Sequence, residues 1–158
     1  MRVWVDASTL IALESIGEVL VLRDLLGRIA ITPAIADEVF TGHESQPLRE
    51  ARASWIEVVP VRGDPKRWTA LGLGIGEASL FETPKGDRLI LDEIPARTVA
   101  EAEGRAYTGL LGLLLAGVEA GTIPVSRAQE ILEKLARSSF RMSTDLYAEV
   151  LRRLRDRA

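Results

Sequence analysis

The sequence predicts an α/β protein with a short parallel sheet of four to five strands and two C-terminal helices. Short runs rich in β-branched and aromatic residues alternate with helical stretches, the pattern typical of parallel strands joined by crossover helices. Two amphipathic helical patterns follow the last of these runs. The chain has 158 residues, 47% hydrophobic and 27% charged, which is the size and composition of one compact domain. We therefore expect a single domain over residues 1–158.

The strands and first helices are predicted from short local signals. Five runs are predicted as strands: Arg2 to Val5, Ile29 to Ile31, Trp55 to Val61, Arg88 to Leu91 and Ala106-Tyr107. The first strand is followed by Asp6 and by a helix whose apolar residues begin at Leu10. A second helix is predicted over Ile16 to Leu26, with Gly27 as its C-terminal stop.

The central helices lie between the later strands. Thr32 as N-cap and Pro33 at the first helical position begin a helix that runs to about Phe40. The remaining segments are a polar loop with a short helix over residues 42–54, a helix from about Gly76 to Thr83, and a helix after Glu93 that runs to about Glu103.

Both C-terminal helices have a recognisable start. Ser126 and Gln129 have the spacing of a capping box for the first helix. Ser143 opens the second, in which apolar residues repeat every four positions from Leu146 to Leu154. Each helix is predicted to pack one apolar face against the rest of the chain.

Cysteine and histidine chemistry is nearly excluded by composition. There is no cysteine and one histidine, His43, in a polar stretch without partners at ligand spacing. Disulfide scaffolds, thiol nucleophiles and zinc fingers are therefore excluded, and His43 is predicted to be an ordinary surface residue. Acid chemistry in this chain would have to rest on carboxylates.

Charge and hydropathy describe a chain without a membrane segment. The net charge is −3, but residues 126–158 carry +3 and the chain contains more arginine than lysine. The arginines near the C-terminus either contact RNA or an acidic partner, or form a solvated helix end. The longest strongly apolar run, Gly109 to Val118, is too short to cross a bilayer, and the start is not a signal peptide. We expect a cytoplasmic protein.

Two aspartates follow predicted buried strands. Asp6 comes after Val-Trp-Val and Asp92 after Leu-Ile-Leu. Ligands of an open parallel sheet bind beyond the carboxyl ends of its strands, so both side chains are placed to face a crevice. The alternative is that each aspartate only caps the helix that follows it.

Two glutamates are further candidates. On the helix after Pro33, Glu38 lies about 60° from the buried position Ile35, whereas Asp37 lies on the opposite face. Glu77 lies in the first turn of a helix preceded by alternating glycines. The alternatives are a solvated glutamate for the first and a favourable interaction with the helix dipole for the second.

A divalent cation would explain why such acids converge. Clustered carboxylates raise one another's pKa, and Mg²⁺ or Mn²⁺ with its oxygen ligands relieves the repulsion. Such an ion can activate water against a phosphodiester. The hydroxyls of Ser8 and Thr108 are candidates for binding a ligand or a phosphate, and both also fit a helix cap.

Five sequence blocks resemble the successive motifs of a PIN-domain nuclease of the VapC-like toxin group. They are Val-Asp-Ala-Ser-Thr-Leu-Ile at 5–11, Ile-Thr-Pro-Ala-Ile-Ala-Asp-Glu-Val ending at Val39, Gly-x-Gly-Glu at 74–77, Leu-Ile-Leu-Asp-Glu at 89–93 and Tyr-Thr-Gly-Leu-Leu-Gly at 107–112. Residues 140–151 resemble the tail of one subfamily of that group.

The resemblance implies a three-layer α/β/α fold and an endoribonuclease that depends on Mg²⁺ or Mn²⁺. It also implies a homodimer that is inhibited by a small antitoxin protein. The metal-binding acids of the family fall on Asp6, Glu38, Glu77 and Asp92, and its supporting hydroxyl falls on Ser8.

Two positions depart from the family pattern. Many PIN domains have Asp or Asn two residues after the threonine that matches Thr108, where this chain has Leu110. The acidic pair after the fourth strand is Asp-Glu instead of Asp-Asp, which leaves the role of Glu93 open. Fewer oxygen ligands would weaken a second metal position first.

Two other functions compete with the nuclease. The loss of an oxygen ligand at Leu110 favours a PIN-like module that binds an antitoxin, or itself, without useful metal affinity. An aspartyl-phosphate phosphatase or receiver fits the fold but not the residues, because Ser8 stands where a second aspartate is needed.

Overall fold

The computed structural model describes residues 1–158 and has one five-stranded sheet in the order β3-β2-β1-β4-β5. The strands are β1 Val3–Val5, β2 Ile29–Ile31, β3 Ile56–Val58, β4 Arg88–Ile90 and β5 Tyr107–Thr108. Every neighbouring pair is parallel. The predicted parallel α/β architecture is therefore confirmed.

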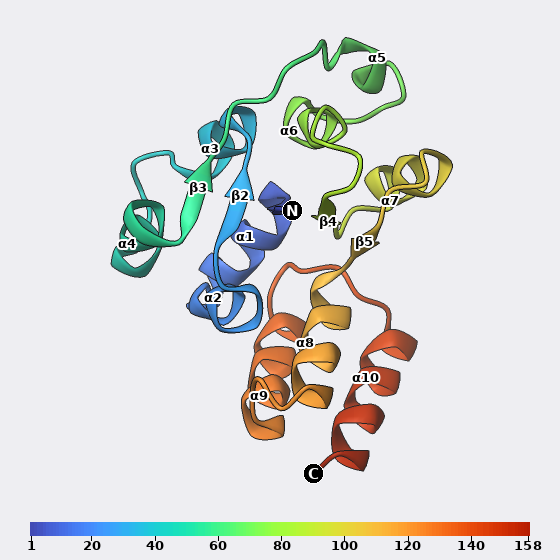
Figure 1. Cartoon of the computed structure of the whole chain (residues 1–158). Coiled ribbons are helices and arrows are strands. Elements are labelled where there is room, and N and C mark those ends of the chain that lie inside the picture. Colours follow the sequence, from blue (N-terminus) through green and yellow to red (C-terminus); the bar gives the residue numbers. More distant parts are fainter.

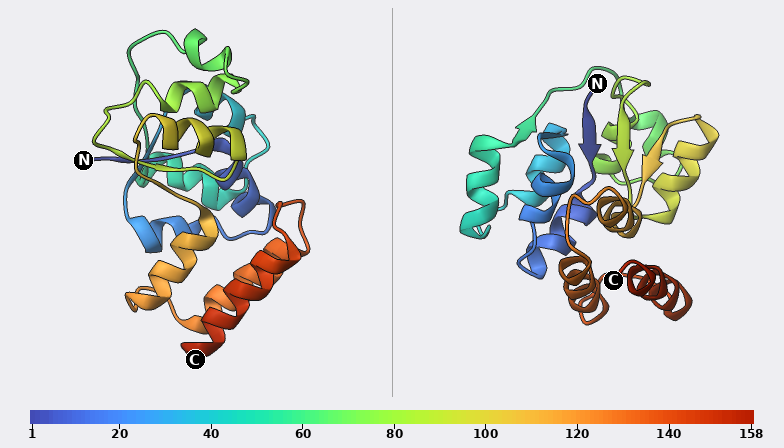
Figure 2. Two further views of the ribbon diagram at one scale, coloured as in Figure 1. Left: turned by 90° about the vertical axis from the view of Figure 1, so that its right-hand side faces the viewer. Right: turned by 60° about the horizontal axis from the view of Figure 1, so that its bottom comes forward.

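Ten helices connect and extend the sheet. They are α1 Ala7–Ser15, α2 Leu20–Leu26, α3 Pro33–Val39, α4 Gln46–Ser54, α5 Lys66–Thr69, α6 Ile75–Leu80, α7 Ile94–Ala102, α8 Leu110–Glu119, α9 Val125–Ala136 and α10 Thr144–Asp156. Helices lie on both sides of the sheet, as expected for three layers (Figures 1 and 2). Helices α8, α9 and α10 pack on one another as a group beyond the sheet (Figure 1).

The order of the strands reverses next to β1. From β1 the chain moves to β2 and β3 on one side, and then returns to place β4 and β5 on the other. The crevice beyond the carboxyl ends of β1 and β4 is therefore the topological switch point of the sheet. Asp6 and Asp92 follow these two strands.

Polar caps fix the start of several helices. The side chains of Asp6, Thr32, Ser45 and Ser143 each accept a hydrogen bond from the backbone N–H three residues further on. These bonds satisfy N–H groups that have no partner within the helix. The predicted caps at Thr32 and Ser143 are thus confirmed.

Some predicted boundaries are wrong. The capping box at Ser126 does not form, because Pro124 occupies the N-cap position of α9 and Ser126 lies in its first turn. The helix predicted from Ile16 begins only at Leu20, since Gly17 adopts a positive φ of 71° that ends α1.

Other elements differ in length from the prediction. Strand β3 is shorter than the predicted 55–61. Helix α4 has nine residues where a short helix was expected, and α5 was not expected. Thr108 lies within β5 and not after it.

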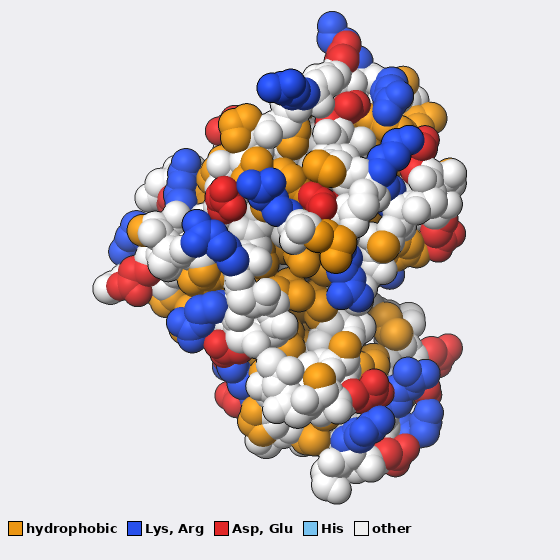
Figure 3. Space-filling model, in the orientation of Figure 1, with side chains coloured by type: hydrophobic (Ala, Val, Ile, Leu, Met, Phe, Trp, Pro, Cys, Tyr) orange, Lys and Arg blue, Asp and Glu red, His pale blue; other side chains and the backbone are white.

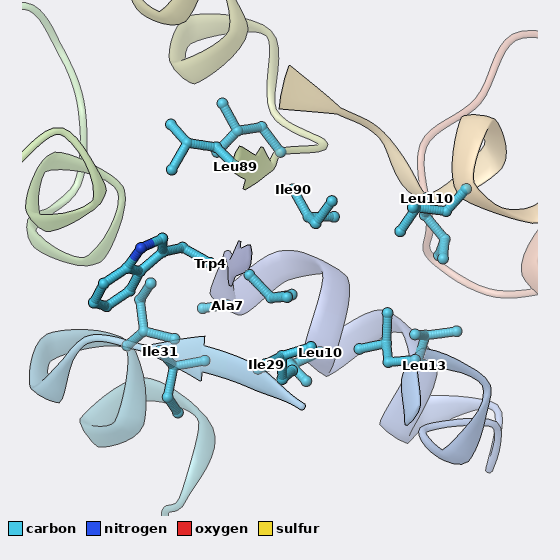
Figure 4. Close-up of a cluster of buried hydrophobic side chains, with 14 of the residues drawn as sticks. Trp4, Ala7, Leu10, Leu13, Ile29, Ile31, Leu89, Ile90 and Leu110 are labelled. Atoms are coloured by element: carbon cyan, nitrogen blue, oxygen red, sulfur yellow. The ribbon is translucent and has the colours of Figure 1, made fainter. Parts of the chain in front are cut away.

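One cluster of 40 buried hydrophobic residues joins the sheet to the helices on both sides. Trp4, Leu89 and Ile90 of the two central strands are almost fully buried, as is typical of strands covered on both faces. Leu110 of α8 lies in the same cluster as these strand residues (Figure 4). The core therefore extends to the carboxyl ends of β1 and β4, where Val5 and Leu91 are fully buried.

None of the ten helices combines the length and the apolar character that a membrane span requires.

Candidate active site

Asp6 lies at the end of β1 and is 1% exposed. Its Oδ1 accepts a hydrogen bond from the Thr9 N–H at 2.9 Å, so it does cap α1. Its Oδ2 accepts from the Ser8 hydroxyl at 3.0 Å and from the Asp92 N–H at 3.0 Å. Burial raises the pKa of Asp6 to about 6; the Thr9 hydrogen bond opposes this shift and the negative charge of Asp92 adds to it. Asp6 is therefore both the N-cap of α1 and a residue of the candidate site.

Asp92 does not cap the helix that follows it. Glu93 occupies the N-cap position of α7, without a side-chain hydrogen bond. The Oδ1 atom of Asp92 instead accepts from the Leu110 N–H at 3.1 Å, at the start of α8. The same oxygen accepts from Arg97 Nη2 at 3.2 Å, and Oδ2 accepts from the Thr9 hydroxyl. Asp92 therefore joins the ends of β1 and β4 to the N-terminus of α8.

Glu77 has one carboxylate oxygen without a partner. Its Oε1 accepts from the Gly74 N–H at 3.3 Å, which satisfies the start of α6. Its Oε2 is buried and makes no hydrogen bond. Burial raises the pKa of Glu77, and the negative charges of Glu93 and Glu38 raise it further against the Gly74 hydrogen bond. This carboxylate lacks a neighbouring positive charge.

Glu38 reaches Glu77 by packing over a glycine. A Cβ built on Gly76 would lie 2.4 Å from Oε1 of Glu38, so a side chain at that position would displace the carboxylate. Helices α3 and α6 pack against each other, which brings the two glutamates together. The glycine before Glu77 thus leaves the space that the Glu38 carboxylate occupies.

The four predicted acids gather as two neighbouring groups. Asp6 interacts with Asp92, and Glu77 interacts with Glu38 and with Glu93, the residue next to Asp92. No three Asp, Glu or His side chains of the chain are arranged to hold one metal ion. The prediction that all four acids meet around one cation is therefore not met by this arrangement of side chains.

The oxygen atoms of these acids are nevertheless the kind of ligand that a hard cation prefers. All five acids offer carboxylate oxygens, and the unpartnered oxygen of Glu77 marks the place where positive charge is missing. Both oxygens of Asp6 and both of Asp92 already accept hydrogen bonds from the protein. A metal ion would have to share or displace those donors at Asp92, whereas it would meet no such competition at Oε2 of Glu77.

The two predicted hydroxyls have different surroundings. Ser8 donates to Asp6 and belongs to the site. The Thr108 hydroxyl instead accepts from Arg88 Nη2 at 3.0 Å, and no contact joins it to the acids. The structure thus brings Ser8 to the carboxylates but not Thr108. Leu110 supplies a backbone N–H to Asp92 while its side chain is buried in the core.

Two residues of the site were not predicted. Thr9 is fully buried and bonds to both aspartates, through its N–H and its hydroxyl. The spacing Asp-x-x-Thr is an N-cap signal that could have indicated its bond to Asp6. Arg97 lies in α7, and no motif of the sequence indicates its bond to Asp92.

The C-terminal arginines are largely paired with acids. Arg152 contacts Glu149 at 2.8 Å and Asp156 at 3.1 Å, and Arg153 contacts Glu149 at 3.0 Å. On the face that Figure 3 shows, basic and acidic side chains are mixed around the C-terminal helices. The arrangement agrees with a solvated helix end more than with an RNA-binding stripe.

Comparison with protein families gives a match over nearly the whole chain. Residues 2–156 match the model of DUF3368, described as a PIN domain. No curated protein and no solved structure gives a match.

Proposed function

Because the chain belongs to the PIN-domain family DUF3368, we propose that it is a metal-dependent endoribonuclease that hydrolyses RNA phosphodiesters. PIN domains are generally metal-dependent nucleases, so the family fixes the broad class of reaction. The dependence on Mg²⁺ or Mn²⁺ and the choice of RNA rest on the resemblance to VapC-like toxins.

One observation carries the proposal: the buried, unpartnered Oε2 of Glu77, beside two further carboxylates. An uncompensated cluster of this kind is unfavourable unless a cation binds to it. To hold the ion, two neighbouring groups of side chains would have to close around it: Asp6 with Asp92, and Glu77 with Glu38 and Glu93. A bound Mg²⁺ or Mn²⁺ would supply an activated water and stabilise the leaving oxygen of the phosphodiester.

The chain's own residues orient these acids. Ser8 and Thr9 hold the Asp6 carboxylate, and Thr9 also holds Asp92, so α1 fixes two acids from different strands. The backbone N–H of Leu110, at the N-terminus of α8, donates to Oδ1 of Asp92 and so holds that carboxylate from a third element. Their positions are therefore set before any ligand arrives.

The biological setting belongs to the same proposal. The resemblance to VapC-like toxins supports a toxin that acts in the cytoplasm as a homodimer and is held inactive by a small antitoxin protein. Where a short open reading frame precedes or overlaps this one, co-expression of the two followed by size-exclusion chromatography tests the partner, and chromatography of the chain alone tests the dimer.

Cleavage assays with matched variants test the enzyme. A single-stranded RNA is incubated with the protein and Mg²⁺, Mn²⁺ or chelator. We expect cleavage only with metal, and a loss of roughly 100-fold or more in Glu77→Gln and Asp92→Asn. Asp37→Asn is the control, because Asp37 is an exposed acid next to Glu38 on the same helix. Unchanged cleavage by Glu77→Gln would show that the assignment is wrong.

A second candidate is a binding module without catalytic activity. It is favoured by the absence of any three acids arranged around one ion, and by the protein donors that occupy Asp6 and Asp92. Calorimetric titration with Mn²⁺ separates the two functions. The nuclease should bind Mn²⁺ and lose that binding in Asp92→Asn. A binding module should show no Mn²⁺ binding that depends on Asp92.

A further inference from the structure

We propose that Arg97 is a built-in counter-ion of Asp92, whose positive charge competes with a metal ion for that carboxylate. The inference rests on the proposed function, because it takes Asp92 as a metal ligand. It gives Arg97 the role of setting how much Mg²⁺ or Mn²⁺ the site needs.

The guanidinium of Arg97 is fixed by three neighbours. Its Nε donates to the Leu91 carbonyl at 2.9 Å, and its Nη2 donates to Oδ1 of Asp92 at 3.2 Å. The third neighbour is Gly109, where an added Cβ would lie only 2.1 Å from Nη2 of Arg97. The absence of a side chain at Gly109 thus provides the space in which the guanidinium reaches Asp92.

Arg97 is the only cation that pairs with the acids of the site. None of the other ion pairs of the chain involves Asp6, Glu38, Glu77, Asp92 or Glu93. The Asp92 side chain is 6% exposed and that of Arg97 is 37% exposed, so the guanidinium reaches solvent whereas the carboxylate is almost covered. An ion bound to Asp92 would therefore lie close to this positive charge.

Arg97 acts on Asp92 through its charge, and it is not needed to hold the carboxylate in place. If the side chain is shortened, Oδ1 of Asp92 still accepts from the Leu110 N–H and Oδ2 still accepts from the Thr9 hydroxyl. Asp92 therefore keeps its orientation and loses only its neighbouring positive charge. Because a like charge a few ångströms away repels a divalent ion, its removal should tighten Mn²⁺ binding by roughly 5- to 10-fold.

Mn²⁺ affinity, measured by calorimetry at low ionic strength, tests the inference in five proteins. They are the parent, Arg97→Gln, Arg97→Lys, Arg97→Met and Asp92→Asn. We expect tighter binding in Arg97→Gln, an affinity within about 2-fold of the parent in Arg97→Lys, and no binding at this site in Asp92→Asn. Arg97→Met should also tighten binding, because it removes the charge and leaves Gly109 unchanged; an added Cβ at Gly109 would lie 3.1 Å from Oδ1 of Asp92 and disturb the ligand itself. Thermal unfolding of each variant verifies that it is folded.

Each contrary result has one meaning. Weaker or unchanged binding in Arg97→Gln overturns the counter-ion role, and so does tightening of equal size in Arg97→Lys. If Arg97→Gln does not fold, Arg97→Met decides alone, and unchanged affinity in it overturns the role. If Asp92→Asn binds Mn²⁺ like the parent, Asp92 is not a ligand and the proposed function itself is wrong. Absence of binding in both the parent and Arg97→Gln overturns both proposals.

Discussion

Replacing Asp6 with asparagine should stabilise the metal-free protein by an amount that grows with pH. The pKa of Asp6 is raised from 3.8 to about 6 in the folded state. The folded protein therefore keeps the proton on Asp6 over a pH range in which the unfolded chain has released it. By linkage, the free energy of unfolding falls as pH rises from about 4 to about 6, and the full cost is present above pH 6.

The pKa change sets the size of the effect. A rise from 3.8 to about 6 corresponds to about 3 kcal/mol of lost stability once the pH is above both values. Asparagine removes this cost and can still accept from the Thr9 N–H as an N-cap. Its amide cannot replace Oδ2 as an acceptor for the Asp92 N–H, which costs about 1–2 kcal/mol. We expect Asp6→Asn to be about 1–2 kcal/mol more stable than the parent at pH 8 and no more stable than it at pH 4.

Urea unfolding at pH 4, 5, 6, 7 and 8 in chelator measures this difference. Asp37→Asn is the control, since Asp37 is exposed on α3 and its removal should leave the pH dependence unchanged. A stability difference between Asp6→Asn and the parent that stays flat from pH 4 to pH 8 would refute the reasoning. The pKa of Asp6 would then not be raised in the folded protein.

Three further substitutions test packing around the site and away from it. Gly76→Ala should displace the Glu38 carboxylate and raise the Mn²⁺ concentration needed for cleavage by about 10-fold, while thermal stability stays equal or rises by up to about 1 kcal/mol. Unchanged metal dependence would contradict a role for Glu38. Gly117→Ala should lower the free energy of urea unfolding by about 1–3 kcal/mol without affecting cleavage, because its Cβ would lie 2.2 Å from a Leu25 methyl group. Thr32→Val should cost about 2–3 kcal/mol in the same assay, since it removes the N-cap of α3 and a buried 2.6 Å hydrogen bond to Ser79. A loss below about 0.5 kcal/mol would show that these bonds contribute little.

Most of the fold could be predicted because its signals are local. Thr32 and Ser143 act as caps through N–H groups three residues away, and the apolar runs become strands through their own residue types. The boundaries that were wrong depend on neighbours further away or on backbone geometry. Pro124 and not Ser126 occupies the N-cap position of α9, and Gly17 ends α1 with a positive φ.

The sequence by itself determined which acids follow the strands, since Asp6 and Asp92 are adjacent in the chain to buried apolar runs. Only the tertiary structure decided how these acids are partnered. Asp92 caps α8, 18 residues away, because β4 and β5 pair in parallel and bring Gly109 and Leu110 to the end of β4. The unpartnered oxygen of Glu77 likewise depends on the packing of α3 against α6. Hydrogen bonds and charges between distant segments depend on the register of the sheet, which no local pattern of residues encodes.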